Sequence, residues 1–300
     1  MITKEAAPGL APAPAPRTPA PPGARPARRR AWDEVPRWHI YLPLGLYLVF
    51  TLVPFYWILL FALRPAGSTS LVPWPVTFDH FEKVWTERSF GVYFQNSVLI
   101  GVCTLVLTTV VALAGGYALA RFDFRFKRSF LLALLCSQFV PGALLLVPLF
   151  QIFANLRMIN SLASVVLAET VFQLPLSMIL ISGFIRNVPY SLEEAAWVDG
   201  CGRLASFRIV VLPLLRPGLI AVGSFAFVHA WNHFLFALMF LSDQSKQTIP
   251  VGLNTLMSAD SVDLGALAAG GIVAAVPVVV VFAFIQKWLI TGFSAGAVKG

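Results

Sequence analysis

Charged residues are scarce in this chain of 300 residues: Asp, Glu, Lys and Arg together make up 12%, whereas hydrophobic residues make up 58%. A soluble globular domain carries about a quarter charged residues. The composition therefore excludes a soluble globular protein and indicates an integral membrane protein. Most of the net charge of +8 lies in the N-terminal segment and in short connections between apolar runs, a pattern that sets membrane topology and does not indicate nucleic-acid binding.

Motifs for metal, nucleotide or redox chemistry are also lacking. The three cysteines show no CxxC or metal spacing, and we interpret them as small apolar side chains. His229 and His233 are four residues apart, but no Glu follows His229 as in HExxH and no third ligand is close in sequence, so we expect no metal. The sequence contains no GxxxxGK[ST] and its polar segments are too short for a nucleotide-binding domain. We expect no bound cofactor and no ATP hydrolysis by this chain.

The N-terminal segment has few large apolar side chains. Residues 1–37 consist mainly of Ala, Pro and Arg, so they cannot bury enough surface to offset the entropy of ordering. They also lack the apolar stretch of a secretory signal. We predict a disordered cytoplasmic tail followed by a membrane domain at 38–300.

Six apolar runs follow, each close to the ~20 residues that cross a bilayer as a helix. They lie near 40–63, 94–120, 130–153, 164–185, 217–241 and 266–290. Six spans put both termini on one side, and 17 of the 22 Lys and Arg residues then share that side. The positive-inside rule predicts an all-α, multi-pass inner-membrane protein with cytoplasmic termini.

Two longer connections fall on the outer side, near 64–93 and 242–265. The first has apolar residues at helical spacing, which predicts an amphipathic helix. These residues are Phe78, Phe81, Val84 and Trp85. Packing is its default role, with solute recognition as the alternative.

A polar stretch at 186–216 interrupts the membrane-like sequence on the cytoplasmic side. Ser191 and Glu194 have the spacing of a capping box, which predicts a short helix ending at Gly200. A second helical pattern follows, with one apolar face and two prolines that end it before the fifth span. Its face comprises Leu204, Phe207 and Val211, and its prolines are Pro213 and Pro217. Glu194 on its own fits either a helix cap in an ordinary connector or a contact with a partner.

The spacing of this stretch resembles the EAA loop of permease subunits in bacterial binding-protein-dependent ABC importers. The matching residues are Glu194-Ala195-Ala196, Gly200 and Leu212-Pro213; Val210 stands where the family usually has Ile. Further segments resemble the carbohydrate branch, closest to the smaller permease of maltose-type importers. They are Asn96-Ser97, Tyr117–Phe122, Trp231–Leu238, Gln247–Gly252 and Gly296–Gly300.

The resemblance implies a type I ABC importer permease fold, with six transmembrane helices and a cytoplasmic two-helix coupling loop. It implies sugar import by alternating access, with a second permease, an ATPase dimer that binds ATP and Mg, and an extracytoplasmic solute-binding protein as partners in the lipid membrane. It also assigns the coupling residues Glu194, Ala195, Ala196, Asp199, Gly200, Phe207, Leu212 and Pro213. The outer segment 242–265 resembles the part that reaches toward the binding protein, although ordinary loop composition would look similar.

Several polar residues within the spans are candidates for the translocation path, because such residues tend to face protein or water. They are Asn96, Glu169, Trp231, Asn232 and His233. Glu169 is the only acidic residue well inside a span, and it fits either a cavity or the membrane interface. His233 departs from the family, in which an acidic residue is frequent after Trp-Asn.

Other functions fit the sequence less well. A secondary transporter would show internal repeats and more ionisable groups within spans. A membrane-embedded enzyme would need a cluster of acid, base or metal ligands. A related solute such as a glycerol phosphate remains an alternative to a sugar, because these importers share the pattern.

Overall fold

The structure is a computed structural model that describes residues 38–257 and 262–296. The predicted tail at 1–37 lies outside the described residues. The described elements are all helical. The longer helices are α1 (Trp38–Leu63), α3 (Phe90–Arg121), α4 (Lys127–Ser137), α5 (Leu146–Asn155), α6 (Leu162–Arg186), α10 (Arg216–Asn232) and α13 (Leu264–Gly296). The shorter ones are α2 (Asp79–Glu82), α7 (Tyr190–Val198), α8 (Arg203–Ser206), α9 (Leu212–Leu214), α11 (Leu235–Phe240) and α12 (Ile249–Met257).

The chain divides into two compact units, residues 1–53 and residues 54–300. The described part of the first unit belongs to α1, whose side chains there are apolar and exposed; Phe50, for example, is 79% exposed. The second unit holds the end of α1 and all other described helices.

Among the described residues, four helices are long and apolar enough to cross a membrane, and up to six spans result if each of two bent helix pairs counts as one. The four are α1, α3, α6 and α13. They match the predicted runs at 40–63, 94–120, 164–185 and 266–290, and the fourth run forms one helix despite Pro175. The segment predicted to be an amphipathic helix forms α2 and a π-helical turn, Lys83–Glu87. Its predicted apolar face forms only in part: Val84 is fully buried, whereas Phe78, which precedes α2, is 67% exposed and Trp85 is 47% exposed.

Two predicted spans were wrong as single helices. The run at 130–153 contains a bend of 96° between α4 and the helical segment Gly142–Asn155. Pro141 lies at this bend with extended backbone. Proline lacks an N–H and disfavours helix in the residue before it, so a helix tends to stop there. In the run at 217–241, α10 ends at Asn232, and His233 has extended backbone before α11 begins.

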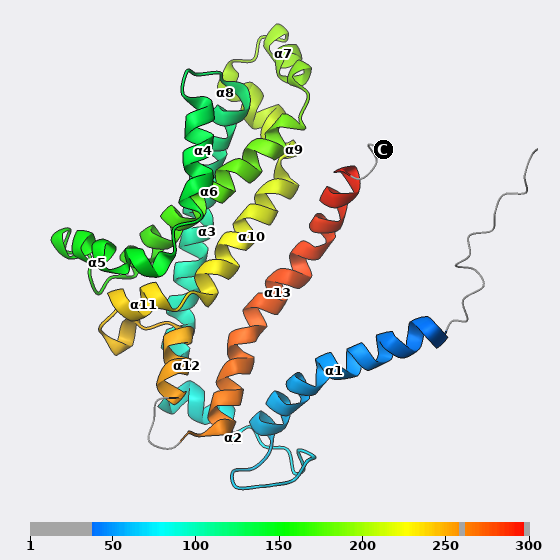
Figure 1. Cartoon of the computed structure of the whole chain (residues 1–300), viewed down its shortest axis with the longest axis vertical. Helices are drawn as coiled ribbons and strands as arrows, with labels where there is room; N and C mark the ends of the chain where they lie inside the picture. Colours follow the sequence, from blue (N-terminus) through cyan, green and yellow to red (C-terminus); the bar gives the residue numbers. More distant parts are fainter. Residues whose placement is uncertain (1–37, 258–261, 297–300) are drawn as a thin grey trace, which may run out of the picture. The chain divides into compact units, whose positions relative to one another are not determined.

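The core of the second unit forms where α3, α6 and α10 pack against one another, and α13 packs along α10 (Figure 1). Close approach depends on small residues. A Cβ atom at Gly116 of α3 would lie 2.7 Å from Ile181 of α6, and one at Gly218 of α10 would lie 2.6 Å from Phe184. Glycine at such crossings lets helices pack through van der Waals contact where the surrounding lipid is itself apolar.

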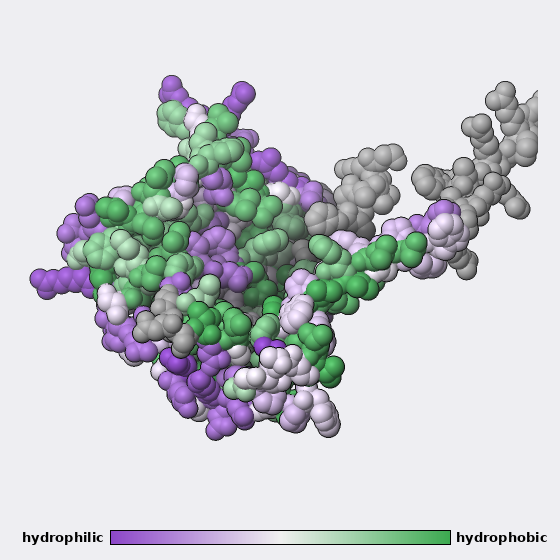
Figure 2. All heavy atoms as spheres, turned by 60° about the horizontal axis from the view of Figure 1, so that its bottom comes forward, coloured by the Kyte–Doolittle hydropathy of each residue, from purple (hydrophilic) through white to green (hydrophobic). Residues whose placement is uncertain are grey.

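Large hydrophobic side chains also cover much of the surface, and Figure 2 shows them in green on one face. Val110 is 60% exposed, Phe225 62% and Phe282 59%. Apolar patches of this extent on a folded protein mark contact with lipid or with other proteins.

Candidate functional site

The connection between α6 and α10 folds as two short helical segments joined by a glycine turn at one end of α3 and α6 (Figure 1). Gly200 has a φ of +87°. Its N–H donates to the Trp197 carbonyl (3.0 Å), and the Cys201 N–H donates to the Ala196 carbonyl (2.9 Å). This pair of bonds around a left-handed residue ends a helix without leaving its last carbonyls unpaired. α7 therefore ends at the predicted glycine.

The start of α7 differs from the prediction. The capping box of Ser191 and Glu194 is wrong, because α7 begins at Tyr190 and no side chain caps it. Pro189 precedes the helix with φ −57° and ψ 130°, so the chain enters the helix before Ser191. Ser191 then lies in the first turn, and Glu194 is exposed and is not a cap.

The second helical segment is also less regular than predicted. It consists of α8, a π-helical turn at Phe207–Val211, and α9. Since a π turn changes the rotation per residue, the predicted apolar face is split: Val211 is fully buried, whereas Leu204 is 70% exposed. Pro213 does not end the segment; it lies in α9, and a bend of 74° follows before α10.

Three side chains fasten α7 to the end of α3. Glu193 is fully buried, and its Oε1 accepts a hydrogen bond from Arg121 Nε at 2.6 Å. The Tyr117 hydroxyl donates to Glu193 Oε2 at 2.7 Å, and the second arm of Arg121 donates to the Val188 carbonyl at 2.9 Å. We call Tyr117, Arg121 and Glu193 the loop clasp.

The loop clasp makes the polar loop an extension of the helical body. The Arg121 side chain is only 9% exposed, so removing either charged partner would leave a buried charge unpaired. Phe207 adds an apolar contact, with its ring edge-on to Tyr117 at 4.9 Å between centroids. Short contacts to a buried carboxylate therefore hold α7 against α3.

The outer face of the loop is accessible. Glu194, Ala195, Asp199 and Gly200 are exposed, whereas Ala196, Phe207, Leu212 and Pro213 are partly buried. The two segments also expose large apolar side chains. They are Tyr190 (44% exposed), Leu192 (43%), Val198 (87%), Leu204 (70%) and Ile209 (67%).

A second polar cluster lies within the helical body. Glu169 of α6 is fully buried, so its side chain does not reach an interface. His229 Nδ1 forms a 3.0 Å hydrogen bond with the carboxylate oxygen Oε2 of Glu169, and His233 Nδ1 lies 2.7 Å from Oε1. The two rings stack with centroids 5.4 Å apart. No group of three residues suited to hold a metal occurs in the described part of the chain.

A family model described as "Binding-protein-dependent transport system inner membrane component" matches residues 112–294. The match includes the loop, its contacts with the end of α3, and the buried cluster. The chain belongs to this family. The resemblance predicted from residues 194–213 is thereby confirmed, and the protein is a multi-pass inner-membrane permease.

Relatives of this permease have similar lengths. It is 34% identical over 276 residues to the diacetylchitobiose uptake system permease protein DasC of Streptomyces coelicolor, covering 90% of this chain and 98% of that one. It is 33% identical to the melibiose/raffinose/stachyose import permease protein MelC of Bacillus subtilis, covering 83% and 91%. A chain in the crystal structure of a bacterial ABC transporter that imports the acidic polysaccharide alginate shares the fold, with a TM-score of 0.70 and 20% identity; the match covers 84% of this chain and 96% of that chain.

The other candidate path residues of the permease make packing contacts. Asn96 donates to the carbonyls of Ser245 (3.0 Å) and Gln247 (2.9 Å), which ties α3 to the outer loop. Trp231 is 2% exposed and donates its indole N–H to the Ala274 carbonyl of α13. Asn232 is exposed and bonds within its own helix.

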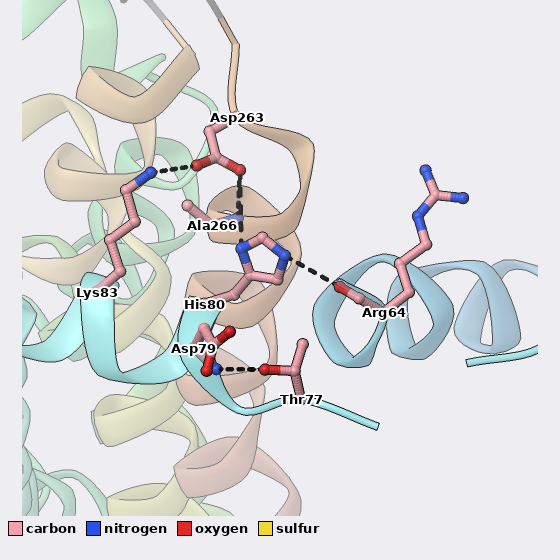
Figure 3. Close-up of polar contacts among 7 residues, drawn as sticks. All are labelled: Arg64, Thr77, Asp79, His80, Lys83, Asp263 and Ala266. Atoms are coloured by element: carbon pink, nitrogen blue, oxygen red, sulfur yellow. Dashed lines mark hydrogen bonds and ion pairs between the residues drawn. The ribbon is translucent and has the colours of Figure 1, made fainter. Parts of the chain in front are cut away.

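The end of the packed helices away from the loop, which the sequence predicts to be the outer end, has a polar cluster of its own, shown in Figure 3. Asp263 accepts a hydrogen bond from the Ala266 N–H (3.0 Å), which caps α13, and one from Lys83 Nζ (2.7 Å). His80 is buried, with Nδ1 3.9 Å from Asp263 and Nε2 3.2 Å from the Arg64 carbonyl. We call His80, Lys83 and Asp263 the outer clasp; it ties the α2 segment to α13.

Sequence reasoning missed the partner of each buried acid. Glu193 stands directly before the motif glutamate, and Tyr117 and Arg121 are spaced to share one face at the end of α3. For Glu169, the signal was the spacing of His229 and His233 opposite a lone acidic residue. In both cases the residues were visible, but their pairing depends on how separate helices pack.

Proposed function

We propose that this permease imports a carbohydrate as the smaller membrane subunit of an ABC importer, working by alternating access. Its relatives named above are permeases for diacetylchitobiose and for melibiose, raffinose and stachyose. The family also implies a solute-binding protein as partner. The observation that carries the coupling role is the loop at 187–215, which is accessible on its outer face and clasped to α3 on its inner face.

The outer face of the loop fits a groove on a separate ATPase subunit. Glu194 presents an exposed carboxylate on segments that also expose large apolar side chains. An anchor of this kind binds a basic residue while the apolar rim excludes water. Because Gly200 turns the chain between α7 and α8, both segments present side chains to one partner.

The inner face transmits the movement. Closure of an ATPase dimer around ATP and Mg would shift α7, and the loop clasp would pass that shift to α3 and so to the packed helices. Such a change requires contacts that differ between two states. ATP and Mg would bind to the partner ATPase, which would hydrolyse the ATP. A homologous second permease would complete the membrane part of the importer. In this orientation the loop and both termini face the cytoplasm.

Recovery of the ATPase with the tagged permease tests the docking role. Cells expressing the complete importer carry either Glu194→Lys or Glu87→Lys, which makes the same charge change at an exposed residue on the outer end. We expect Glu194→Lys to lower the recovered ATPase by about tenfold or more, because reversing one charge of a contact costs several kcal/mol. Glu87→Lys should recover the wild-type amount.

Wild-type recovery and transport with Glu194→Lys would show that the loop does not dock through this residue. Family membership would be unaffected. A parallel loss with Glu87→Lys would indicate damage to the fold and not to docking.

A further inference from the structure

A cavity of about 200 Å³ lies where α4, α6 and α10 meet. Its lining combines polar side chains with aromatic rings. The residues used below are Gln138, Phe172, Gln173, Ser177, Phe225 and His229. A second cavity of about 360 Å³ adjoins it and shares Gln138 and Phe172.

The backbone at this place is interrupted. α4 ends at Ser137, and the chain bends by 96° before it continues toward α5. Within a bilayer, non-helical backbone is tolerated where it is buried in protein or lines a water-filled cavity. Transporters commonly build their solute sites from such discontinuous helices. The break next to the cavity therefore favours a wet site over contact with lipid.

Polar groups in the cavity have hydrogen-bonding capacity to spare. Ser177 is 7% exposed and lines the cavity, and its hydroxyl can both donate and accept a hydrogen bond. Gln173 uses its amide nitrogen in a long contact of 3.4 Å to the Ala226 carbonyl, which leaves its side-chain oxygen for another donor. A ligand with hydroxyl groups could bond to both side chains.

His229, which contacts the buried Glu169, sets the polar edge of this cavity. Glu169 engages Nδ1 of His229, so the other ring nitrogen, Nε2, is left to bond elsewhere. The His229 side chain is 52% exposed and lines the cavity. The buried Glu169 carboxylate fixes the ring of His229, which faces the cavity. The imidazoles of His229 and His233 cover the carboxylate, which does not contact solvent.

We propose that this cavity is a contact site for a neutral sugar on its way through the importer, an inference that rests on the proposed function. Two amides, a hydroxyl and an imidazole suit sugar hydroxyls, which both donate and accept, and the rings of Phe172 and Phe225 suit the apolar face of a sugar ring. The volume is below the ~300–1,000 Å³ of a complete ligand pocket. The site therefore holds one part of the solute, and the facing second permease holds the rest.

The test uses the complete importer with its binding protein in proteoliposomes. Trehalose, melibiose, raffinose and diacetylchitobiose are the probes, and the sugar carried best by the wild type is kept. Ser177→Val removes the cavity hydroxyl with little change of shape. Thr109→Val makes the same change on α3, outside this cavity. Since one hydrogen bond is lost, Ser177→Val should lower the sugar delivered per ATP hydrolysed by about three- to tenfold, and Thr109→Val should not.

Water access to the site is measured separately with Ser177→Cys in a chain whose natural cysteines are replaced by alanine. A water-soluble methanethiosulfonate should modify this cysteine, and the carried sugar should slow the modification during turnover. Failure of the cysteine to react in any state, or reaction without protection, would overturn the site.

Two further outcomes separate the site from the proposed function. If the wild type carries a sugar and Ser177→Val delivers as much per ATP as Thr109→Val, the site is wrong and sugar import stands. If the wild type hydrolyses ATP but carries none of the probes, sugar import itself fails and the site fails with it. Wild-type recovery of the ATPase with each variant shows that the variant is folded.

Discussion

Glu193 and Glu194 are adjacent in the chain and lie in opposite environments. Successive residues of a helix point in directions about 100° apart, so one glutamate of α7 faces α3 while the next faces away. Glu193 is fully buried against Arg121 and Tyr117, whereas Glu194 is exposed. One residue therefore holds the loop to the body and the other is free for a partner.

Removing one member of the loop clasp should destabilise the protein more than removing the exposed glutamate. Arg121→Ala leaves the Glu193 carboxylate buried and unpaired, which costs about 3–5 kcal/mol. Glu194→Ala, the matched control on the same helix, should change the free energy of unfolding by about 0.5 kcal/mol or less. Thermal unfolding of the purified permease in detergent measures both.

The double variant Arg121→Leu/Glu193→Leu distinguishes a lost ion pair from general damage. Apolar residues in place of a buried pair are often close to neutral in stability, so the double variant should lose less stability than the two single leucine variants summed. Additive losses would show that the two side chains do not interact.

The buried cluster shows where prediction from single residues ends. The sequence paired His229 with His233 by their spacing and singled out Glu169 separately, and it argued against a metal because no HExxH glutamate and no third ligand were close in sequence. It left open whether Glu169 reaches an interface. The answer depends on the packing of α6 against α10, which brings residues 60 positions apart to 3.0 Å, and a single sequence contains no direct signal for that distance.

At the scale of elements, continuous apolar runs predicted where helices lie but not where those helices are interrupted. Hydrophobicity reports where the chain is apolar, and it does so equally on both sides of the bend between α4 and α5. Pro141 was a visible signal for that bend. The end of α10 at Asn232 had none, because Trp231, Asn232 and His233 include no helix breaker. The capping box failed for a related reason: Pro189 started α7 before Ser191 was reached.

The outer clasp links two elements and should make their association sensitive to acid. The hydrogen bond from Lys83 holds the pKa of Asp263 below its ordinary value of 3.8. A lowered pKa in the folded state means that the stabilisation is fully present above the ordinary value, falls as the pH drops below it, and is lost once the pH passes the lowered pKa. For a partly exposed pair the contribution is about 1 kcal/mol or less.

Asp263→Asn should therefore lower the melting temperature at pH 7 and leave it unchanged relative to wild type at the most acidic pH at which the protein stays soluble. Asp79→Asn is the matched control, because Asp79 is an exposed carboxylate on the same segment. Melting curves of the three proteins between pH 3 and pH 7 show the difference. A gap between Asp263→Asn and wild type that stays constant with pH would contradict the role of the carboxylate charge.

At the scale of the second unit, the loop and the outer clasp lie at opposite ends of the packed helices (Figure 1). The proposed docking to an ATPase requires the loop end to face the cytoplasm, and the excess of Lys and Arg predicts the same side. The outer end then carries the segment that includes Ser70, and α12, which packs against α3 and α13. The proposed function therefore predicts binding-protein contact and ATPase contact at different ends, so each can be tested without disturbing the other.

Thiol labelling tests this orientation directly. With Cys103 and Cys136 replaced by alanine, Cys201 remains as a natural thiol in the loop, and Ser70→Cys adds an exposed thiol at the outer end. In spheroplasts, an impermeant maleimide should label Ser70→Cys and spare Cys201. In membranes opened and stripped of peripheral subunits, it should label Cys201 as well. Labelling of Cys201 in sealed spheroplasts would place the loop outside, and no cytoplasmic ATPase could then bind it.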